Sequence, residues 1–265
     1  MRFMEFGTSN RKTLLMFHCA LEPWWAFEDA ARAAAEDYHV ILSVADGHDE
    51  SGSEFTTVED YAGKTVTWLK DHGIEKLDMA YGVSMGGSAL MHLVAMQLIP
   101  VEKAVIDAGI TPYPYPRWIC RIIAKKDLAT MSFACRNRAV MEAAMPPERW
   151  TPEGQDSTEH YDRVWAFLQD HMTDTTIYNV FWSANNYAMP DPMPELDTKM
   201  EYWYGENEKK ARRANIRYAR KAFPDITLRE FPGLEHGELV MMFPERFHQE
   251  IQRFGTNDPD VPACD

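Results

Sequence analysis

Strand-like and helix-like segments alternate along the first 110 residues of this chain. Apolar runs with the length of buried strands lie at 13–18, 39–46, 76–83 and 102–109, after a short strand predicted at 1–6. Segments of helical composition or helical apolar spacing separate them, at 25–38, at 57–72 and after residue 86. This alternation predicts an α/β fold with a mostly parallel central sheet and helices on both of its faces.

The alternation stops at residue 111 and resumes at residue 199. The segment 111–198 looks helical, is rich in Trp, Tyr, Phe and Met, and has proline clusters at both ends. After it, strands predicted at 199–205 and 226–233 alternate with helices at 208–223 and 243–254. We therefore predict a core domain of residues 1–110 and 199–265, with 111–198 inserted as a helical lid and with a loosely ordered tail from residue 255.

Charge and composition exclude several classes of protein. The 265 residues carry a formal net charge of −14, which repels phosphate backbones, so we expect no nucleic-acid partner. No apolar run approaches ~18 residues and the first residues lack an apolar signal segment, so we expect a cytoplasmic protein without a membrane partner. The widely spaced Cys19, Cys120, Cys135 and Cys264 predict free thiols rather than a metal site or a disulfide framework. The sequence indicates no metal and no organic cofactor, and it says nothing about oligomeric state.

A serine at the end of the strand 76–83 is framed by glycines, in the stretch Gly82-Val83-Ser84-Met85-Gly86. A sharp turn from strand to helix at Ser84 lifts its hydroxyl above the sheet edge, and glycines on both sides avoid clashes in such a turn. The helix that follows directs its first N–H groups, Met85 foremost, at the same point. Such an arrangement activates a serine nucleophile and binds an oxyanion.

On these residues the chain resembles the α/β-hydrolase family, which includes many esterases, lipases and peptidases. The resemblance covers residues 1–110 and 199–254, with 111–198 in the usual position of the lid. It implies a general base after the last strand, and His236 in "GLEHGEL" matches that position. It implies an acid after the preceding strand, where Glu208 in "YWYGENEKK" matches. Glu206, and Asp107 near the end of the strand 102–109, remain open as alternative acids.

The loop after the strand 13–18 is implied to supply the second oxyanion donor. The family commonly has His-Gly there, whereas this chain has His18-Cys19, and Ala20 then offers its N–H beside that of Met85. Cys19 is a poorer nucleophile than Ser84 because no base lies beside it in the sequence.

The loop 45–53, "ADGHDESGS", also resembles a loop of the family. There we expect Asp46, His48 and Ser51 to form structural hydrogen bonds. A metal site made of His48, Asp49 and Glu50 is disfavoured, because nothing in the sequence sets a ligand geometry.

The lid segment contributes aromatic side chains and two arginines of interest. Most of its aromatic residues are expected to pack a helical core, and some to line an apolar pocket above the serine. Arg136 and Arg138 fit a solvated helix face better than a grip on a substrate carboxylate.

The sequence therefore predicts a serine hydrolase, most generically a carboxylesterase, that cleaves an ester, thioester or amide bond of a small, partly apolar substrate. The alternative is a ligand-binding or interaction protein that keeps the fold without turnover. A dinucleotide site is disfavoured, because "GVSMGG" lacks the required glycine spacing and does not follow the first strand.

Overall fold

A seven-stranded sheet forms the centre of the computed structural model, which describes residues 1–256. The strand order is β1-β3-β2-β4-β5-β6-β7; β1 runs antiparallel to β3, and all other neighbours are parallel. The prediction of a mostly parallel sheet is confirmed. The strands are β1 (Arg2–Phe6), β2 (Lys12–Phe17), β3 (Tyr38–Val44), β4 (Leu77–Val83), β5 (Val101–Asp107), β6 (Lys199–Gly205) and β7 (Thr227–Phe231).

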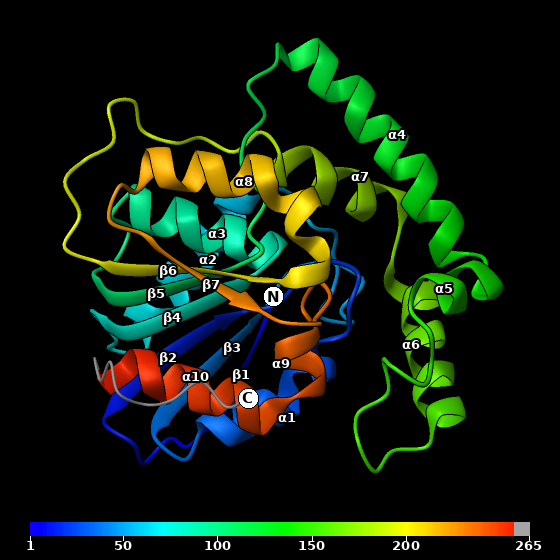
Figure 1. Cartoon of the computed structure of the whole chain (residues 1–265), viewed down its shortest axis with the longest axis horizontal. Coiled ribbons are helices and arrows are strands. Elements are labelled where there is room, and N and C mark those ends of the chain that lie inside the picture. The colour runs from blue at the N-terminus through cyan, green and yellow to red at the C-terminus, as the bar shows by residue number, and fades with distance from the viewer. Residues whose placement is uncertain (257–265) are drawn as a thin grey trace.

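Helices cover both faces of the sheet (Figure 1). On one face lie α2 (Val58–Asp71), α3 (Met85–Ala95) and α8 (Lys209–Ala222), and on the other lie α1 (Glu28–Ala34) and α10 (Pro244–Thr256). Side chains of a strand point alternately to the two faces. On β4, for example, Met79 and Tyr81 belong to the core beneath α1 and α10, whereas Ala80 belongs to the core beneath α2 and α3. Each face therefore has its own apolar core.

Four helices between β5 and β6 make up the helical insertion, residues 111–198. They are α4 (Arg117–Cys135), α5 (Arg138–Ala144), α6 (Ser157–His171) and α7 (Asp174–Ala184). In Figure 1 the long helix α4 stands away from the sheet, while α5 and α6 lie at one end of it. Trp118 and Phe133 on α4 are 65% and 60% exposed, so these two aromatic residues do not pack in a core.

The predicted helix 25–38 is the clearest error of the sequence interpretation. A 3₁₀ turn, η1 (Trp24–Phe27), precedes α1, and α1 ends at Ala34. Tyr38 is already the first residue of β3, where it pairs with Lys12 of β2 and is buried. Helical composition thus yields to strand pairing and burial at this boundary.

Smaller differences occur at other element ends. Helix α3 ends at Ala95, well before Pro100, because Gln97 adopts a left-handed conformation with φ 51°. The short helix α9 (Glu238–Met242) was not predicted. The loose tail was predicted from residue 255, but Gly255 and Thr256 still belong to α10. The rest of the predicted tail, with Cys264, lies outside the described residues. None of the helices formed by residues 1–256 combines the length and apolarity that spanning a bilayer requires.

Candidate active site

The turn between β4 and α3 is a strained elbow with Ser84 at its tip. Ser84 has φ 55° and ψ −115°, a conformation that non-glycine residues rarely adopt. A Cβ on Gly82 would lie 2.4 Å from the carbonyl oxygen of Gly86, and a Cβ on Gly86 would lie 2.4 Å from that of Phe17. Glycine is therefore required at both positions, and the elbow geometry expected from the sequence is present.

His236 and Glu208 meet beyond the ends of β6 and β7. The Nδ1 atom of His236 lies 2.7 Å from Oε2 of Glu208, and the Gly205 N–H donates to Oε1 of Glu208 at 3.3 Å. Arg212 follows one helical turn later and places its Nε 2.9 Å from Oε2 of Glu208. Burial disfavours ionisation of Glu208, but the hydrogen bond from His236 and the charge of Arg212 hold its pKa below the usual range. The carboxylate is thus ionised and fixes the Nδ1–H tautomer of His236.

The two alternative acids have other partners. Glu206 is exposed and accepts a hydrogen bond from the Gly233 N–H at 2.9 Å. Asp107 is buried and accepts from the Tyr81 hydroxyl at 2.6 Å. Burial raises the pKa of Asp107 to about 6, although the Tyr81 bond opposes this shift. Of the three carboxylates, Glu208 is the one bonded to His236.

The loop that carries His236 packs tightly over the turn that carries Glu208. A Cβ on Gly205 would lie 2.3 Å from the carbonyl oxygen of Leu234, so this approach requires glycine. The Asn207 N–H donates to the same carbonyl at 3.1 Å, and its side-chain amide donates to Glu235 at 2.9 Å. The two turns therefore hold each other in place.

Ser84 and His236 lie at the same edge of the sheet but do not bond to each other. Val83 pairs with Asp107, and Asp107 pairs with Trp203, so β4, β5 and β6 end side by side. The Val83 side chain lies 3.6 Å from the point that a Cβ on Gly237 would occupy. No hydrogen bond between Ser84 and His236 is formed within residues 1–256. Such bonds are often long before substrate binds, and close only in the complex.

The loop after β2 is held against the loop 45–53 by two buried, neutral histidines. His18 Nδ1 donates to the Cys19 carbonyl at 2.5 Å, and its Nε2 accepts from the Ala45 N–H at 3.0 Å. His48 Nε2 accepts from the Leu21 N–H at 3.1 Å. Burial lowers the pKa of His18 to about 3 and that of His48 to about 4, so both rings remain uncharged acceptors at neutral pH.

The two predicted oxyanion donors, the N–H groups of Met85 and Ala20, lie close to the contact between the elbow and the loop after β2. A Cβ on Gly86, the residue after Met85, would lie 2.6 Å from the carbonyl oxygen of His18, so the loop touches the elbow. Within the described part of the chain, the N–H groups of Met85 and Ala20 have no hydrogen-bond acceptor. Cys19 is buried, and burial raises the pKa of its thiol well above the usual value, which disfavours a nucleophilic thiolate.

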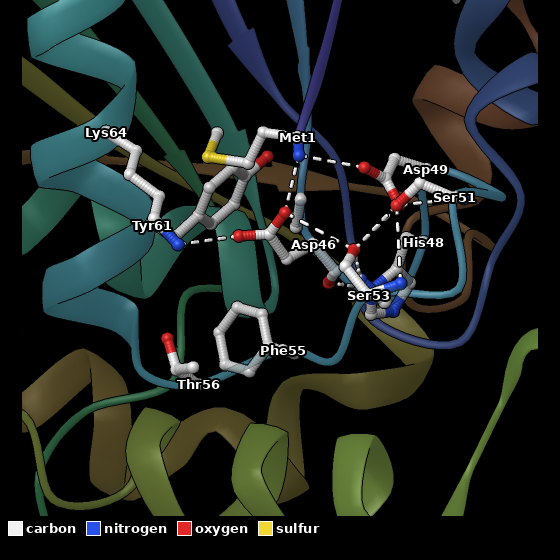
Figure 2. Close-up of polar contacts among 12 residues, drawn as sticks. Met1, Asp46, His48, Asp49, Ser51, Ser53, Phe55, Thr56, Tyr61 and Lys64 are labelled. Carbon is white, nitrogen blue, oxygen red and sulfur yellow. Dashed lines mark hydrogen bonds and ion pairs between the residues drawn. The ribbon is translucent and has the colours of Figure 1, made fainter.

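The loop 45–53 forms the polar network drawn in Figure 2. Ser51 donates to Asp49 at 2.7 Å, Lys64 pairs with Asp46 at 2.7 Å, and the amino group of Met1 lies 2.8 Å from Asp49. These contacts agree with the structural role expected for this loop. Within residues 1–256, no group of three or more His, Cys, Asp or Glu side chains has an arrangement that would hold a metal ion.

A small pocket, partly open to solvent, lies between the helical insertion and the core. Residues of η1, α5, α6 and α9 and of adjoining loops line it, and most of them are apolar. They are Glu22, Ala26, Met141, Met145, Trp150, His160, Tyr161, Val164, Met241 and Met242. Trp150 is therefore one aromatic residue of the insertion that faces a pocket, but Ser84 and His236 do not line this pocket.

The arginines of the insertion make ion pairs with their own surroundings. Arg136 pairs with Asp174 at 2.9 Å, and Arg138 pairs with Glu142 and with Asp162, at 2.6 and 2.5 Å. These contacts favour the interpretation that both arginines lie on a solvated helix face. Neither arginine lines the pocket.

Two residues of the site were not singled out from the sequence. Arg212 follows Glu208 at the i, i+4 spacing of a helical ion pair, a signal that was available in the sequence. Glu22 is the single charge in the apolar stretch 19–27, and its isolation was the only sequence signal for it.

The model of the alpha/beta hydrolase family matches residues 14–250. The chain therefore belongs to the alpha/beta hydrolase family, and the resemblance seen in its sequence is confirmed. No curated protein matches the chain in sequence.

Solved structures with the same fold share little sequence with this chain. An alpha/beta hydrolase family protein from Desulfitobacterium hafniense is 19% identical, with a TM-score of 0.72 over 95% of this chain and 99% of that one. A serine hydrolase from Cycloclasticus zankles is 16% identical, with a TM-score of 0.72 over 97% and 94% of the two chains. An enol-lactonase from Burkholderia xenovorans is 18% identical, with a TM-score of 0.66 over 96% of each. At these identities the similarity establishes the fold alone.

Proposed function

We propose that this protein is a serine hydrolase in which Ser84 is the nucleophile, His236 the general base and Glu208 the acid that orients the base. Ser84 attacks the carbonyl of an ester, thioester or amide, and His236 takes its proton. The N–H groups of Met85 and Ala20 bind the oxyanion that develops. His236 then protonates the leaving group, and water releases the acyl group by the reverse sequence of proton transfers.

One observation carries this proposal: the hydrogen bond of 2.7 Å between His236 and a buried, ionised Glu208, beside a serine held at φ 55°. A strained backbone persists only where the surrounding structure enforces it, and such strain concentrates at functional sites. A neutral imidazole with its Nδ1–H fixed by a carboxylate presents Nε2 as a base. The free N–H groups at the start of α3 and in the loop after β2 add the electrostatic part of the mechanism.

The substrate class that we propose is a small, partly apolar ester, as for a carboxylesterase. The pocket beneath the insertion is lined mainly by Met, Val, Trp and Tyr side chains, which favour an apolar group. Relatives in fold described as a serine hydrolase and as an enol-lactonase are consistent with carbonyl chemistry at such a site. In this proposal the helical insertion acts as the lid.

Labelling with a fluorophosphonate probe tests the proposal. We expect the wild-type protein to be labelled, Ser84→Ala to lose the label, and Cys19→Ala to keep it. A folded wild-type protein that stays unlabelled would instead support a ligand-binding protein that retains the fold. If labelling succeeds, the rates on p-nitrophenyl esters of graded acyl length define the preferred substrate.

A further inference from the structure

Glu22 is a carboxylate without a partner in an otherwise apolar pocket. It lies two residues after Ala20, and its side chain lines the pocket beneath the helical insertion. Within the described residues, no side chain or N–H group makes a hydrogen bond or an ion pair with it. Glu22 is partly buried, and a carboxylate without a partner is costly in mostly apolar surroundings.

The titratable groups around Glu22 supply no positive charge. His160 and Tyr161 line the same pocket, and the charge of Glu22 helps to raise the pKa of the Cys19 and Cys135 thiols, which carry no positive charge. Burial lowers the pKa of His160, so its ring is neutral at pH 7. Burial also raises the pKa of Glu22 itself to about 8.

We propose that this pocket is a substrate subsite in which Glu22 binds a cationic group, such as a protonated amine or a quaternary ammonium. The proposal rests on the proposed hydrolase function, since the pocket adjoins both parts of that site. Glu22 follows the oxyanion loop directly in the chain. Met241, another lining residue, places its methyl carbon 3.1 Å from the point that a Cβ on Gly237, the neighbour of His236, would occupy.

The pocket walls fit a cation better than they fit a neutral polar group. Trp150 and Tyr161 are among the lining residues, and aromatic rings attract a cation electrostatically, while the methionines are adaptable, polarisable contacts. A bound cation also supplies the charge that Glu22 lacks, so that the carboxyl ionises and pairs with it. The net charge of −14 favours the approach of cations to the whole protein.

Calorimetric titration with hexylammonium and with 1-hexanol, at pH 8, tests the subsite without requiring turnover. The two probes match in length and differ in charge. We expect the wild-type protein to bind hexylammonium about 10- to 100-fold more tightly than hexanol, the ratio that a charge-assisted hydrogen bond supplies. In Glu22→Gln, which keeps the shape of the side chain, this ratio should fall to about one. Asp29→Asn removes the same charge from an exposed position of α1 and should keep the ratio.

The outcomes separate this proposal from that of the hydrolase. Equal binding of the two probes, failure of both to bind, or an unchanged ratio in Glu22→Gln would each overturn the subsite. If the charge-dependent binding holds while the fluorophosphonate probe does not label Ser84, the subsite stands and the catalytic proposal fails. With an active enzyme, a choline ester should have a higher kcat/KM than the 3,3-dimethylbutyl ester of the same acid. This preference should again be lost in Glu22→Gln.

Discussion

Two glutamates, Glu208 and Glu22, have contrasting surroundings. Glu208 is buried with an imidazole, a backbone N–H and a guanidinium around it, and its pKa is lowered. Glu22 lies among apolar side chains with no partner, and its pKa is raised to about 8. Burial alone raises the pKa of a carboxyl group; burial with partners lowers it.

Under the two proposals made above, the contrast separates two tasks of the site. A carboxylate that must orient a base throughout the reaction is surrounded by permanent partners. A carboxylate that recognises a substrate group must leave one position open for it, and the free protein bears the cost. The predictions below test this difference, from the largest expected effect to the smallest.

The largest effect is expected for Glu208→Gln. Gln cannot stabilise the imidazolium and permits the wrong tautomer of His236, so kcat should fall by roughly 10³- to 10⁴-fold. Steady-state kinetics on an ester that the wild type cleaves gives the measurement. Glu206→Gln, two residues away and exposed, is the matched control and should stay within about twofold of wild type. A larger loss in Asp107→Asn than in Glu208→Gln would assign the acid to Asp107 instead.

Gly205→Ala should disrupt the region around Glu208 almost as much. Its Cβ would meet the carbonyl oxygen of Leu234 at 2.3 Å, and that oxygen is backbone, which cannot move aside cheaply. We expect a loss of about 2–4 kcal/mol in the free energy of unfolding, measured by urea denaturation, together with weakened activity. Gly233→Ala is not a suitable control, because Gly233 has φ 71°. Gly63→Ala, with open space around its Cβ, should be neutral or slightly stabilising.

Arg212→Gln removes one partner of Glu208 while leaving His236 in place. The pKa of Glu208 should then rise toward its usual value, so that the loss of activity on acidification begins at higher pH. The free energy of unfolding depends on pH with the same sign. A carboxyl group whose pKa is lowered in the folded state stabilises the protein at pH values above its unfolded pKa, and this stabilisation is lost as the pH falls. We expect about a tenfold loss in kcat at neutral pH and a shifted acidic limb of the pH profile.

Arg212→Lys should recover part of the effect, and Arg213→Gln, which is exposed, should show neither change. An unmoved acidic limb in Arg212→Gln would contradict a positioning role.

The sequence was sufficient for those parts of the molecule that depend on local pattern. The strand run 76–83, the glycines around Ser84 and the spacing from strand end to His236 are all local features, and the elbow and the sheet follow from them. The helix predicted at 25–38 was wrong at both ends, because η1 and the pairing of Tyr38 depend on distant residues.

The environment of a side chain was the part that sequence did not predict. Glu208 follows a stretch of aromatic residues, and Glu22 precedes one. Nothing local in the sequence distinguishes the paired carboxyl group from the unpaired one. The difference arises from chain segments that are far apart in the sequence. The loop 232–236 brings His236 to Glu208, whereas α5, α6 and α9 bring only apolar side chains, a neutral His160 and Tyr161 to Glu22. Only the packed structure decides which carboxyl has a partner.

The smallest effect, on stability, is expected for Glu22→Gln. With a folded pKa of about 8 and a lower unfolded value, Glu22 costs nothing below about pH 4.5, and its cost grows until about pH 8. The variant should therefore match wild type near pH 4.5 and exceed it by about 1 kcal/mol at pH 8, well below what the full pKa shift would give, because Glu22 is partly exposed and solvent screens its charge. Urea denaturation across this range measures the difference, and Asp29→Asn should show no comparable growth with pH. A Glu22→Gln protein that is less stable than wild type at pH 8 would mean that the carboxylate has a partner in the free protein, and the contrast with Glu208 would then disappear.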